Sequence, residues 1–337
     1  MVEIKVNVEK SPIPLVWLDS SILLKITKTQ LEEITNDVDK ERYQYLNDSI
    51  KDKTKEKKLI CPSADQLEEV QIGGRLEEEF QRVQSSLSLG IKINHRQGIE
   101  EFLIAKFMKA YIDSENEIQL SYKDIFDEDP IKELENALKL PFIMVIQNTK
   151  LKELLEKEKE IKKALPERWE QLRLEKVKAG VTFEEEREKE FKSYFGTLLM
   201  LKNKSSDNIH KGNFNILDLA NATNFWYYLT CWDYYGGKPP GLAGLSKFFS
   251  SDYFKQVPPI EIACNIRAKL ATQKNPIKSG DYMDIEQIST VLPFFDLVVT
   301  DKSMKHCLNL FRYHKKFNCI ILSIKDFDKI KSYLSSL

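Results

Sequence analysis

The sequence lacks the features that mark disulfide-rich secreted proteins and membrane proteins. Its five cysteines, an odd number, form no Cys-x-x-Cys pair, and the N-terminus shows no signal-like pattern. We therefore expect reduced thiols in a cytoplasmic protein. No apolar run approaches the length of a membrane span, which predicts that the chain does not cross a membrane.

The chain also carries little net charge. Its 51 lysines and arginines balance 52 aspartates and glutamates, for a formal net charge of -1. This balance argues against binding nucleic acid through bulk positive charge, although a local basic patch would not show in the total. With 337 residues, of which 42% are hydrophobic and 31% charged, the chain has enough material for one large globular domain or two ordinary ones.

A nucleotide-binding P-loop is missing as well. The glycine-rich stretch Gly236-Gly-Lys-Pro-Pro-Gly-Leu-Ala-Gly244 does not end in Gly-Lys-Ser or Gly-Lys-Thr. Two prolines also stand where the backbone N–H groups of a P-loop would be needed. We expect an ordinary loop there. The sequence shows no internal repeat and no low-complexity tail.

Short apolar segments separated by helical patterns are what the sequence does contain. The segments lie at residues 15–18, 58–62, 297–299 and 318–323. Few, short, apolar strands with helices between them favour a parallel sheet. We therefore predict an α/β fold, with a small parallel sheet flanked by helices. Residues 1–14, which are polar and contain two prolines, are expected to form an N-terminal arm.

The middle of the chain has mainly helical patterns. Mixed-charge tracts around residues 151–195 predict a helical hairpin that projects from the body. The aromatic residues of 225–235 could stack unpaired bases, but a core helix is the commoner use of such a cluster. We predict a discontinuous α/β core formed by residues 1–97 and 245–337, and a mostly helical insertion at residues 98–244.

Acidic residues recur where the predicted strands end or helices begin. Asp19 follows the first strand, acids of the 63–69 turn follow the second, Asp284 opens a helix and Asp301 ends a strand. Each alone is explained by helix capping or by the helix dipole. Gathered at one edge of a parallel sheet, they would repel and raise one another's pKa. A hard cation, Mg²⁺ or Mn²⁺, removes that repulsion, which predicts metal-assisted phosphodiester hydrolysis.

Four short motifs carry these acids in order along the chain. They are Val16-Trp-Leu-Asp19-Ser-Ser21, Ser63-Ala-Asp-Gln-Leu-Glu68, Asp284-Ile-Glu-Gln-Ile288 and Val298-Val-Thr-Asp301. In their order and spacing they resemble the PIN and PIN-like domain nucleases. Gly280-Asp-Tyr-Met-Asp284 followed by Leu292-Pro-Phe-Phe-Asp296 is similar to bacterial PIN-like proteins. The resemblance covers residues 14–72 and 255–335 and leaves the helical middle unexplained.

The resemblance implies a metal-dependent endoribonuclease with an acidic catalytic site. The residues implied to be catalytic and to bind one or two Mg²⁺ or Mn²⁺ ions, directly or through water, are Asp19, Glu68, Asp284 and Asp301. Glu69 also fits the position given to Glu68. Asp281 or Asp296 could replace or support Asp284, so the third ligand stays open.

The resemblance also implies the substrate and the residues around the ligands. The substrate would be RNA, cut as single strands or in the loop of a folded RNA. Ser20 and Thr300 would orient ligands or water through their hydroxyl groups. Positive charge to hold the RNA backbone would come from Arg267, Lys269, Lys274 and Lys302, together with the neighbouring Lys278 and Lys305.

Two other functions compete with a ribonuclease. In the first, the acidic edge is vestigial, and the chain is a non-catalytic PIN-like scaffold that binds RNA or protein through its helical insertion. In the second, the chain is a structure-specific DNA nuclease of the related flap-cutting kind, for which the sequence shows no hairpin-type DNA-binding signature. The sequence does not decide whether a protein inhibitor or partner binds the insertion, or whether the chain dimerises.

Overall fold

The computed structural model describes residues 4–64, 66, 74–139, 167–277 and 281–337, with only the backbone described at 216–217 and 281–284. These residues form two compact units. Unit 1 comprises Met1–Asn7, Gln97–Leu120 and Glu170–Pro276, and unit 2 comprises Val8–Arg96, Ser121–Trp169 and Ile277–Leu337.

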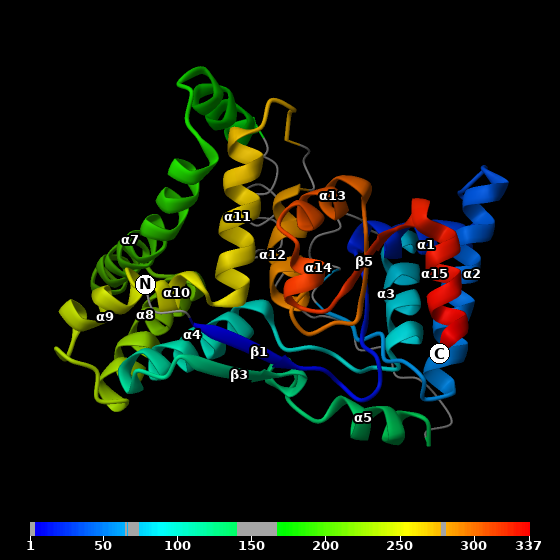
Figure 1. Cartoon of the computed structure of the whole chain (residues 1–337), viewed down its shortest axis with the longest axis horizontal. Helices are drawn as coiled ribbons and strands as arrows, with labels where there is room; N and C mark the ends of the chain where they lie inside the picture. The colour runs from blue at the N-terminus through cyan, green and yellow to red at the C-terminus, as the bar shows by residue number, and fades with distance from the viewer. Residues whose placement is uncertain (1–3, 65, 67–73, 140–166, 278–280) are drawn as a thin grey trace. The chain divides into compact units, whose positions relative to one another are not determined.

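A parallel sheet forms the centre of unit 2 (Figure 1). Its strands are β2 (Val16–Leu18), β4 (Leu297–Thr300) and β5 (Ile320–Ser323), in the order β2-β4-β5. Both neighbouring pairs are parallel. Every residue of β2 and β4 is buried, as expected for parallel strands covered on both faces.

Two isolated bridges continue the parallel pairing beyond β2. Leu15 pairs with Ile60, and Ser63 pairs with Lys92, both in parallel. The first strand of this sheet along the chain, β2, therefore lies in the middle, with residues 60–63 and 92 on one side and β4 and β5 on the other. Segments that follow β2 are first added on one side of it, and β4 and β5 are then added on the other side. Open α/β sheets bind ligands at such a switch point, outside the carboxyl ends of the strands.

The two faces of the sheet take alternate side chains of each strand. Val16 and Leu18 belong to a core that packs α1 (Ser20–Gln30), α2 (Asp37–Lys55), α3 (Arg75–Ser88) and α15 (Phe327–Ser336) on one face. Trp17 points to the other face, where its ring meets Phe295 edge-on with centroids 5.7 Å apart. This alternation with a period of two follows from the pleat of a β-strand.

Further short helices complete unit 2. They are 3-10 helix η2 (Tyr122–Ile125), α5 (Pro130–Ala137), α12 (Asp281–Val291), α13 (Lys302–Leu310), α14 (Tyr313–Lys316) and 3-10 helix η3 (Ile324–Asp326). In Figure 1, α12, α13 and α14 lie on the side of β5 opposite to α1, α2, α3 and α15. Helices thus flank the sheet on both sides.

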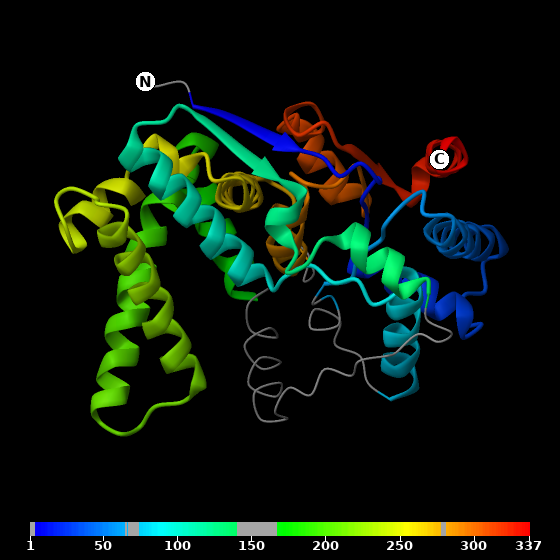
Figure 2. The same cartoon turned by 90° about the horizontal axis from the view of Figure 1, so that it is seen from below.

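Unit 1 is built mainly of helices. It contains α4 (Arg96–Asp113), α7 (Phe183–His210), α8 (Ile216–Tyr234), α9 (Leu242–Phe249), α10 (Asp252–Lys255) and α11 (Pro258–Thr272). Figure 2 shows α7 and α8 side by side, joined by a short turn. Aromatic rings form much of its core, among them those of Trp232, Phe248 and Phe254.

The predicted fold class is confirmed, but two strands were missed. The protein is a mixed α/β structure, mostly helical, with small sheets. Residues of the expected N-terminal arm form β1 (Lys5–Glu9), which pairs with β3 (Glu117–Ser121) in a two-stranded sheet. Strand β3 lies in the stretch expected to be mainly helical. Its alternation of buried Ile118 and Leu120 with exposed neighbours is the signal that could have located it.

The described part of the predicted helical hairpin is helical. Residues 167–178 form a helix, and α7 follows after a turn in which Gly180 has a φ of 69°. Lys176 and Glu186 form an ion pair across this turn, with Nζ and Oε1 2.5 Å apart. Residues 151–166 lie outside the described residues. Residues 245–276 belong to unit 1, and the division into a nuclease core and an insertion stays a prediction.

We predict that Gly244→Ala destabilises unit 1 whereas Gly98→Ala does not. A Cβ on Gly244 would lie 1.8 Å from the carbonyl oxygen of Pro239, which accepts a hydrogen bond from Trp232 Nε1. Overpacking of this kind lowers the free energy of unfolding by about 1–3 kcal/mol. Gly98, in helix α4, has nothing within 4 Å of a Cβ, so alanine there should stabilise by up to about 1 kcal/mol. Urea denaturation measures both, and equal stability of the two variants would contradict the prediction.

Candidate metal site at the carboxyl edge of the sheet

Asp19 and Asp301 follow the two strands at the switch point. Asp19 comes directly after β2 and is the N-cap of α1, and Asp301 comes directly after β4 and is the N-cap of α13. In the parallel register Leu18 lies opposite Val299, and the backbone N–H of Asp19 donates to the carbonyl of Val299 at 3.0 Å. The pairing of β2 with β4 therefore brings two carboxylates together from opposite ends of the sequence.

The carboxylate of Asp19 is buried and hydrogen-bonded through both of its oxygens. Asp19 as a whole residue is only 3% exposed. Oδ2 accepts a hydrogen bond from the Thr300 hydroxyl at 2.5 Å, and Oδ1 accepts one from the backbone N–H of Ser21 at 3.2 Å. Thr300 is itself fully buried. The hydroxyl predicted to orient a ligand thus contacts Asp19, one of the four proposed ligands.

Burial raises the pKa of Asp19, and the nearby charge of Asp301 raises it further. Hydrogen bonds from Thr300 and from the backbone N–H groups of Ser21 and Asp301 lower the pKa but do not compensate. Ionising a buried carboxyl beside a second carboxylate is unfavourable unless a cation balances the charge. An all-oxygen pair of this kind suits Mg²⁺ or Mn²⁺.

Asp301 is less buried than Asp19 and also holds a helix end. Its Oδ1 accepts hydrogen bonds from the backbone N–H of Ser303 at 2.6 Å and of Met304 at 3.4 Å. Both bonds use the same oxygen. The capping role therefore engages Oδ1 of Asp301. Both aspartates are therefore helix N-caps, as the capping interpretation expects. Capping does not prevent either of them from also binding a metal ion.

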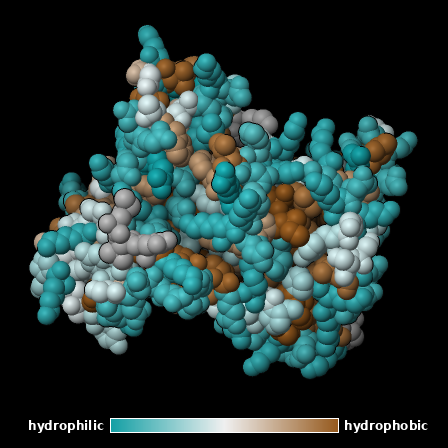
Figure 3. Space-filling view, in the orientation of Figure 1, coloured by the Kyte–Doolittle hydropathy of each residue, from teal (hydrophilic) through white to brown (hydrophobic). Residues whose placement is uncertain are grey.

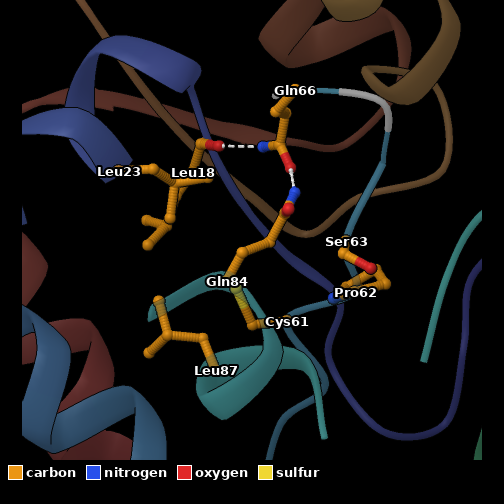
Figure 4. Close-up of a pocket in the computed structure, with 8 residues that line it drawn as sticks. All are labelled: Leu18, Leu23, Cys61, Pro62, Ser63, Gln66, Gln84 and Leu87. Carbon is orange, nitrogen blue, oxygen red and sulfur yellow. Dashed lines mark hydrogen bonds between the residues drawn. The ribbon is translucent and has the colours of Figure 1, made fainter. Parts of the chain in front are cut away.

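Two glutamines hold another segment against the end of β2 (Figure 4). Gln66, 2% exposed, donates from Nε2 to the carbonyl of Leu18 at 2.7 Å, and Gln84 Nε2 donates to Gln66 Oε1 at 2.6 Å. Gln84 Nε2 also donates to the carbonyl of Ala64 at 3.1 Å. Since Leu18 directly precedes Asp19, these bonds place Ala64 and Gln66 at the carboxyl end of β2.

These glutamines were not expected from the sequence. Gln66 stands within the second of the four motifs, but a neutral amide gave no signal of its own. It lines a small pocket, part of it open to solvent, with the residues drawn in Figure 4: Leu18, Leu23, Cys61, Pro62, Ser63, Gln84 and Leu87. Glu68 and Glu69 follow a few positions later and lie outside the described residues.

Asp296 lies at the opposite end of β4. It precedes the strand, and its Oδ2 accepts a hydrogen bond from the backbone N–H of Leu15 at 2.8 Å. Four residues of strand lie between it and Asp301, which places the two residues roughly 16 Å apart at the rise of a β-strand. The structure therefore does not bring Asp296 to Asp19. Asp296 and Asp301 are close in sequence, but they lie at opposite ends of β4.

The remaining predicted ligands and basic residues are placed only in part. The predicted helix is present as α12, but it begins at Asp281, three residues before Asp284, which was expected to open it. The side chains of residues 281–284 lie outside those described. Ser20 is the first residue of α1 and is buried. Of the six basic residues, three belong to unit 1, namely Arg267, Lys269 and Lys274. The exposed Lys302 at the start of α13 and Lys305 belong to unit 2, and Lys278 lies outside the described residues.

The third strand of the sheet ends beside an ion pair. Asp326 Oδ2 accepts hydrogen bonds from the backbone N–H of Ser323 at 2.9 Å and from its hydroxyl at 2.8 Å. Lys305 Nζ donates to the same oxygen at 2.6 Å. Lys305 was expected to hold RNA, but in this structure its charge is paired with Asp326.

The described residues contain part of a metal site at most. Among them, no group of three or more histidine, cysteine, aspartate or glutamate side chains is placed to hold a metal ion. Asp19 and Asp301 are two of the four proposed ligands, and the side chains of Glu68 and Asp284 fall outside this set. All five cysteines are free, in agreement with the expected reduced thiols.

Comparison with known proteins adds no relative. No protein-family model, no curated protein and no solved structure matches the chain. Within the residues that the structure describes, none of the helices is both long enough and apolar enough to span a membrane. The chemistry of the site must therefore be argued from its own geometry.

We predict that Asp326→Asn removes a pH-dependent part of the stability. Burial opposes ionisation of Asp326, but the hydrogen bonds from Lys305 and Ser323 and the Lys305 charge outweigh it and lower its pKa from 3.8 to about 2. The interaction therefore stabilises the fold above about pH 4 and is lost as the pH falls toward 2. At pH 7 the variant should lose up to about 2 kcal/mol of unfolding free energy.

The matched control is Asp328→Asn, which removes a charge from an exposed aspartate two residues away. Denaturation curves from pH 7 to pH 2 should show the deficit of Asp326→Asn shrinking with acidity, while the control stays close to wild type. A deficit of Asp326→Asn that did not change with pH would contradict the assignment.

Proposed function

We propose that the protein is a Mg²⁺- or Mn²⁺-dependent phosphodiesterase that cuts RNA. The observation that carries the proposal is the meeting of Asp19 and Asp301 at the carboxyl ends of adjacent parallel strands. This is the switch point of the sheet, where open α/β folds place ligands. RNA as the substrate rests on the resemblance of the four motifs to PIN-like nucleases.

The chain's own residues suit the work such a site requires. Asp19 and Asp301 offer oxygen ligands of like charge, and the Thr300 hydroxyl fixes the orientation of the Asp19 carboxylate. Gln66, which precedes Glu68 by two positions in the sequence, is itself held at the end of β2 by its hydrogen bond to Leu18. With Glu68 and Asp284 the ligand set would be complete. When bound, the metal would activate water and neutralise charge on the phosphodiester.

A non-catalytic scaffold is the second candidate. Both aspartates act as helix N-caps, and capping alone accounts for an acid at these positions. Capping does not explain why the buried carboxylate of Asp19 lies near Asp301, whose negative charge opposes the ionisation of Asp19. Metal binding and cleavage separate the two candidates.

We predict that Mn²⁺ raises the melting temperature of the wild type and leaves that of Asp19→Asn unchanged. A ligand that binds only the folded state stabilises it by about 2.7 kcal/mol at a concentration of 100 Kd. In EDTA, Asp19→Asn should be at least as stable as wild type. Asparagine can still cap α1, and the substitution removes a buried charge.

Asp296→Asn is the matched control for this measurement. It neutralises a partly buried aspartate at the other end of the same sheet, so its response to Mn²⁺ should equal that of wild type. A wild type that Mn²⁺ does not stabilise would sink the metal-site proposal. Loss of the response in Asp296→Asn but not in Asp19→Asn would place the site at the other edge.

We predict that the wild type cuts labelled RNA in Mn²⁺ and that Asp301→Asn reduces kcat/KM by about 100-fold or more, because a direct ligand is lost. Thr300→Val, which removes only the hydroxyl bonded to Asp19, should weaken Mn²⁺ binding by about 10–100-fold. Cleavage of single-stranded RNA, folded RNA and matching DNA is measured for wild type and both variants, with Asp296→Asn as the control. Cleavage of DNA alone would favour the DNA nuclease, and Mn²⁺ binding without any cleavage would favour the scaffold.

A further inference from the structure

Helix α8 of unit 1 has an exposed face that carries almost no charge. Its inner side chains are buried, among them Tyr228 and Trp232, each 1% exposed. We call its exposed residues the outer face of α8: Leu219, Ala220, Thr223, Trp226, Tyr227, Thr230, Asp233 and Tyr234. Trp226 is 53% exposed and Tyr234 83%.

The lack of charge on the outer face contrasts with the rest of the chain. Charged residues make up 31% of the sequence, and hydrophilic residues dominate the face of the protein seen in Figure 3. Of the eight residues Asp233 alone is charged, and its Oδ1 already accepts a hydrogen bond from the backbone N–H of Gly241 at 2.8 Å. Aromatic residues on a weakly charged face are typical of protein interfaces.

The outer face is also symmetric along the helix. About the midpoint between Trp226 and Tyr227, its residues fall into four pairs: Trp226 with Tyr227, Thr223 with Thr230, Ala220 with Asp233, and Leu219 with Tyr234. Two aromatic rings occupy the centre, hydroxyl residues follow on each side, and large apolar side chains close both ends. A two-fold interface requires a surface of this self-complementary kind.

We propose that the outer face of α8 pairs antiparallel with the same face of a second copy of this chain. Each listed pair would then become a contact between copies, with Leu219 against Tyr234 at both ends and Thr223 against Thr230 between. No like charges would face each other, because Asp233 would lie opposite Ala220. The spacing of Leu219, Thr223, Trp226 and Thr230, alternately four and three residues apart, is that of a helix-pairing seam.

The area of the outer face indicates a weak dimer. At about 200 Å² for a whole aromatic side chain, the three exposed aromatics offer roughly 350 Å² per chain. Standard interfaces bury about 800 Å² per partner, so the dimer belongs to the weaker class. We expect it to form in the micromolar range, where it exchanges with monomer.

Single-stranded nucleic acid is a less suitable occupant. Stacking of bases on aromatic rings is accompanied by a positively charged groove that follows the backbone. The outer face contains no lysine or arginine. Lys202 of α7 lies 5.8 Å from the Trp226 ring, and a single cation does not form such a groove.

The test uses two double variants of the full chain that change the same two positions. In Thr223→Lys with Thr230→Lys, each lysine would face a lysine of the other copy. In Thr223→Lys with Thr230→Glu, each lysine would face a glutamate. Sedimentation equilibrium in EDTA, from about 1 to 100 µM, compares both with wild type and with the control Val38→Lys, which charges an exposed residue of α2 in unit 2.

Wild type and Val38→Lys should approach twice the monomer mass of 39.3 kDa at the highest concentrations. The double-lysine variant should dimerise at least about tenfold more weakly, and the lysine–glutamate variant should regain most of the loss. Circular dichroism confirms that all variants are folded. A monomeric wild type, an unaffected double-lysine variant, or two equally weakened double variants would each overturn the proposal. Binding of single-stranded RNA by a monomeric wild type, lost in Trp226→Ala, would assign the face to nucleic acid.

Discussion

The parallel pairing of β2 with β4 is the constraint on which the candidate site depends. It joins residues 16–18 to residues 297–299, so the hydroxyl of Thr300 reaches a carboxylate 281 positions earlier in the chain. All of the paired side chains are buried and apolar, which makes this register costly to change, since a slip by one residue would turn each side chain to the other face. The hydrophobic effect thus holds two like-charged groups together that would separate in water.

Asp19 and Asp301 can serve two purposes because both lie at the carboxyl edge of the sheet, where strands end and helices begin. As N-caps, Asp19 and Asp301 start the helices that cover the sheet. As neighbouring carboxylates, they raise the free energy of the metal-free protein, because burial and mutual repulsion both oppose the ionisation of Asp19. A bound cation would offset this cost, and the proposed metal site rests on this reasoning. Unit 1 carries the opposite kind of surface, an exposed helix face nearly without charge.

The sequence was informative where one residue type has one structural meaning. Apolar runs located β2, β4 and β5, and aspartates after them located helix starts. It was less informative where geometry decides. Asp296 and Asp301 flank the same strand and differ only in which end they occupy. The aromatic residues of α8 are buried or exposed according to their position around the helix, so Tyr228 packs in the core while Trp226 faces solvent. Strands β1 and β3 were missed because each is short and has few apolar residues. Their strand conformation depends on pairing with each other, which the sequence does not show.

A crystal structure of the protein in MnCl₂, with an anomalous difference map, tests the central claim most directly. We expect an anomalous peak at the carboxyl ends of β2 and β4, with carboxylate oxygens of both Asp19 and Asp301 in its coordination shell. We also expect the Asp19–Thr300 and Asp301–Ser303 hydrogen bonds to persist beside the metal. A map with no peak there, in crystals where Mn²⁺ binds elsewhere or not at all, would show that the two aspartates only cap helices.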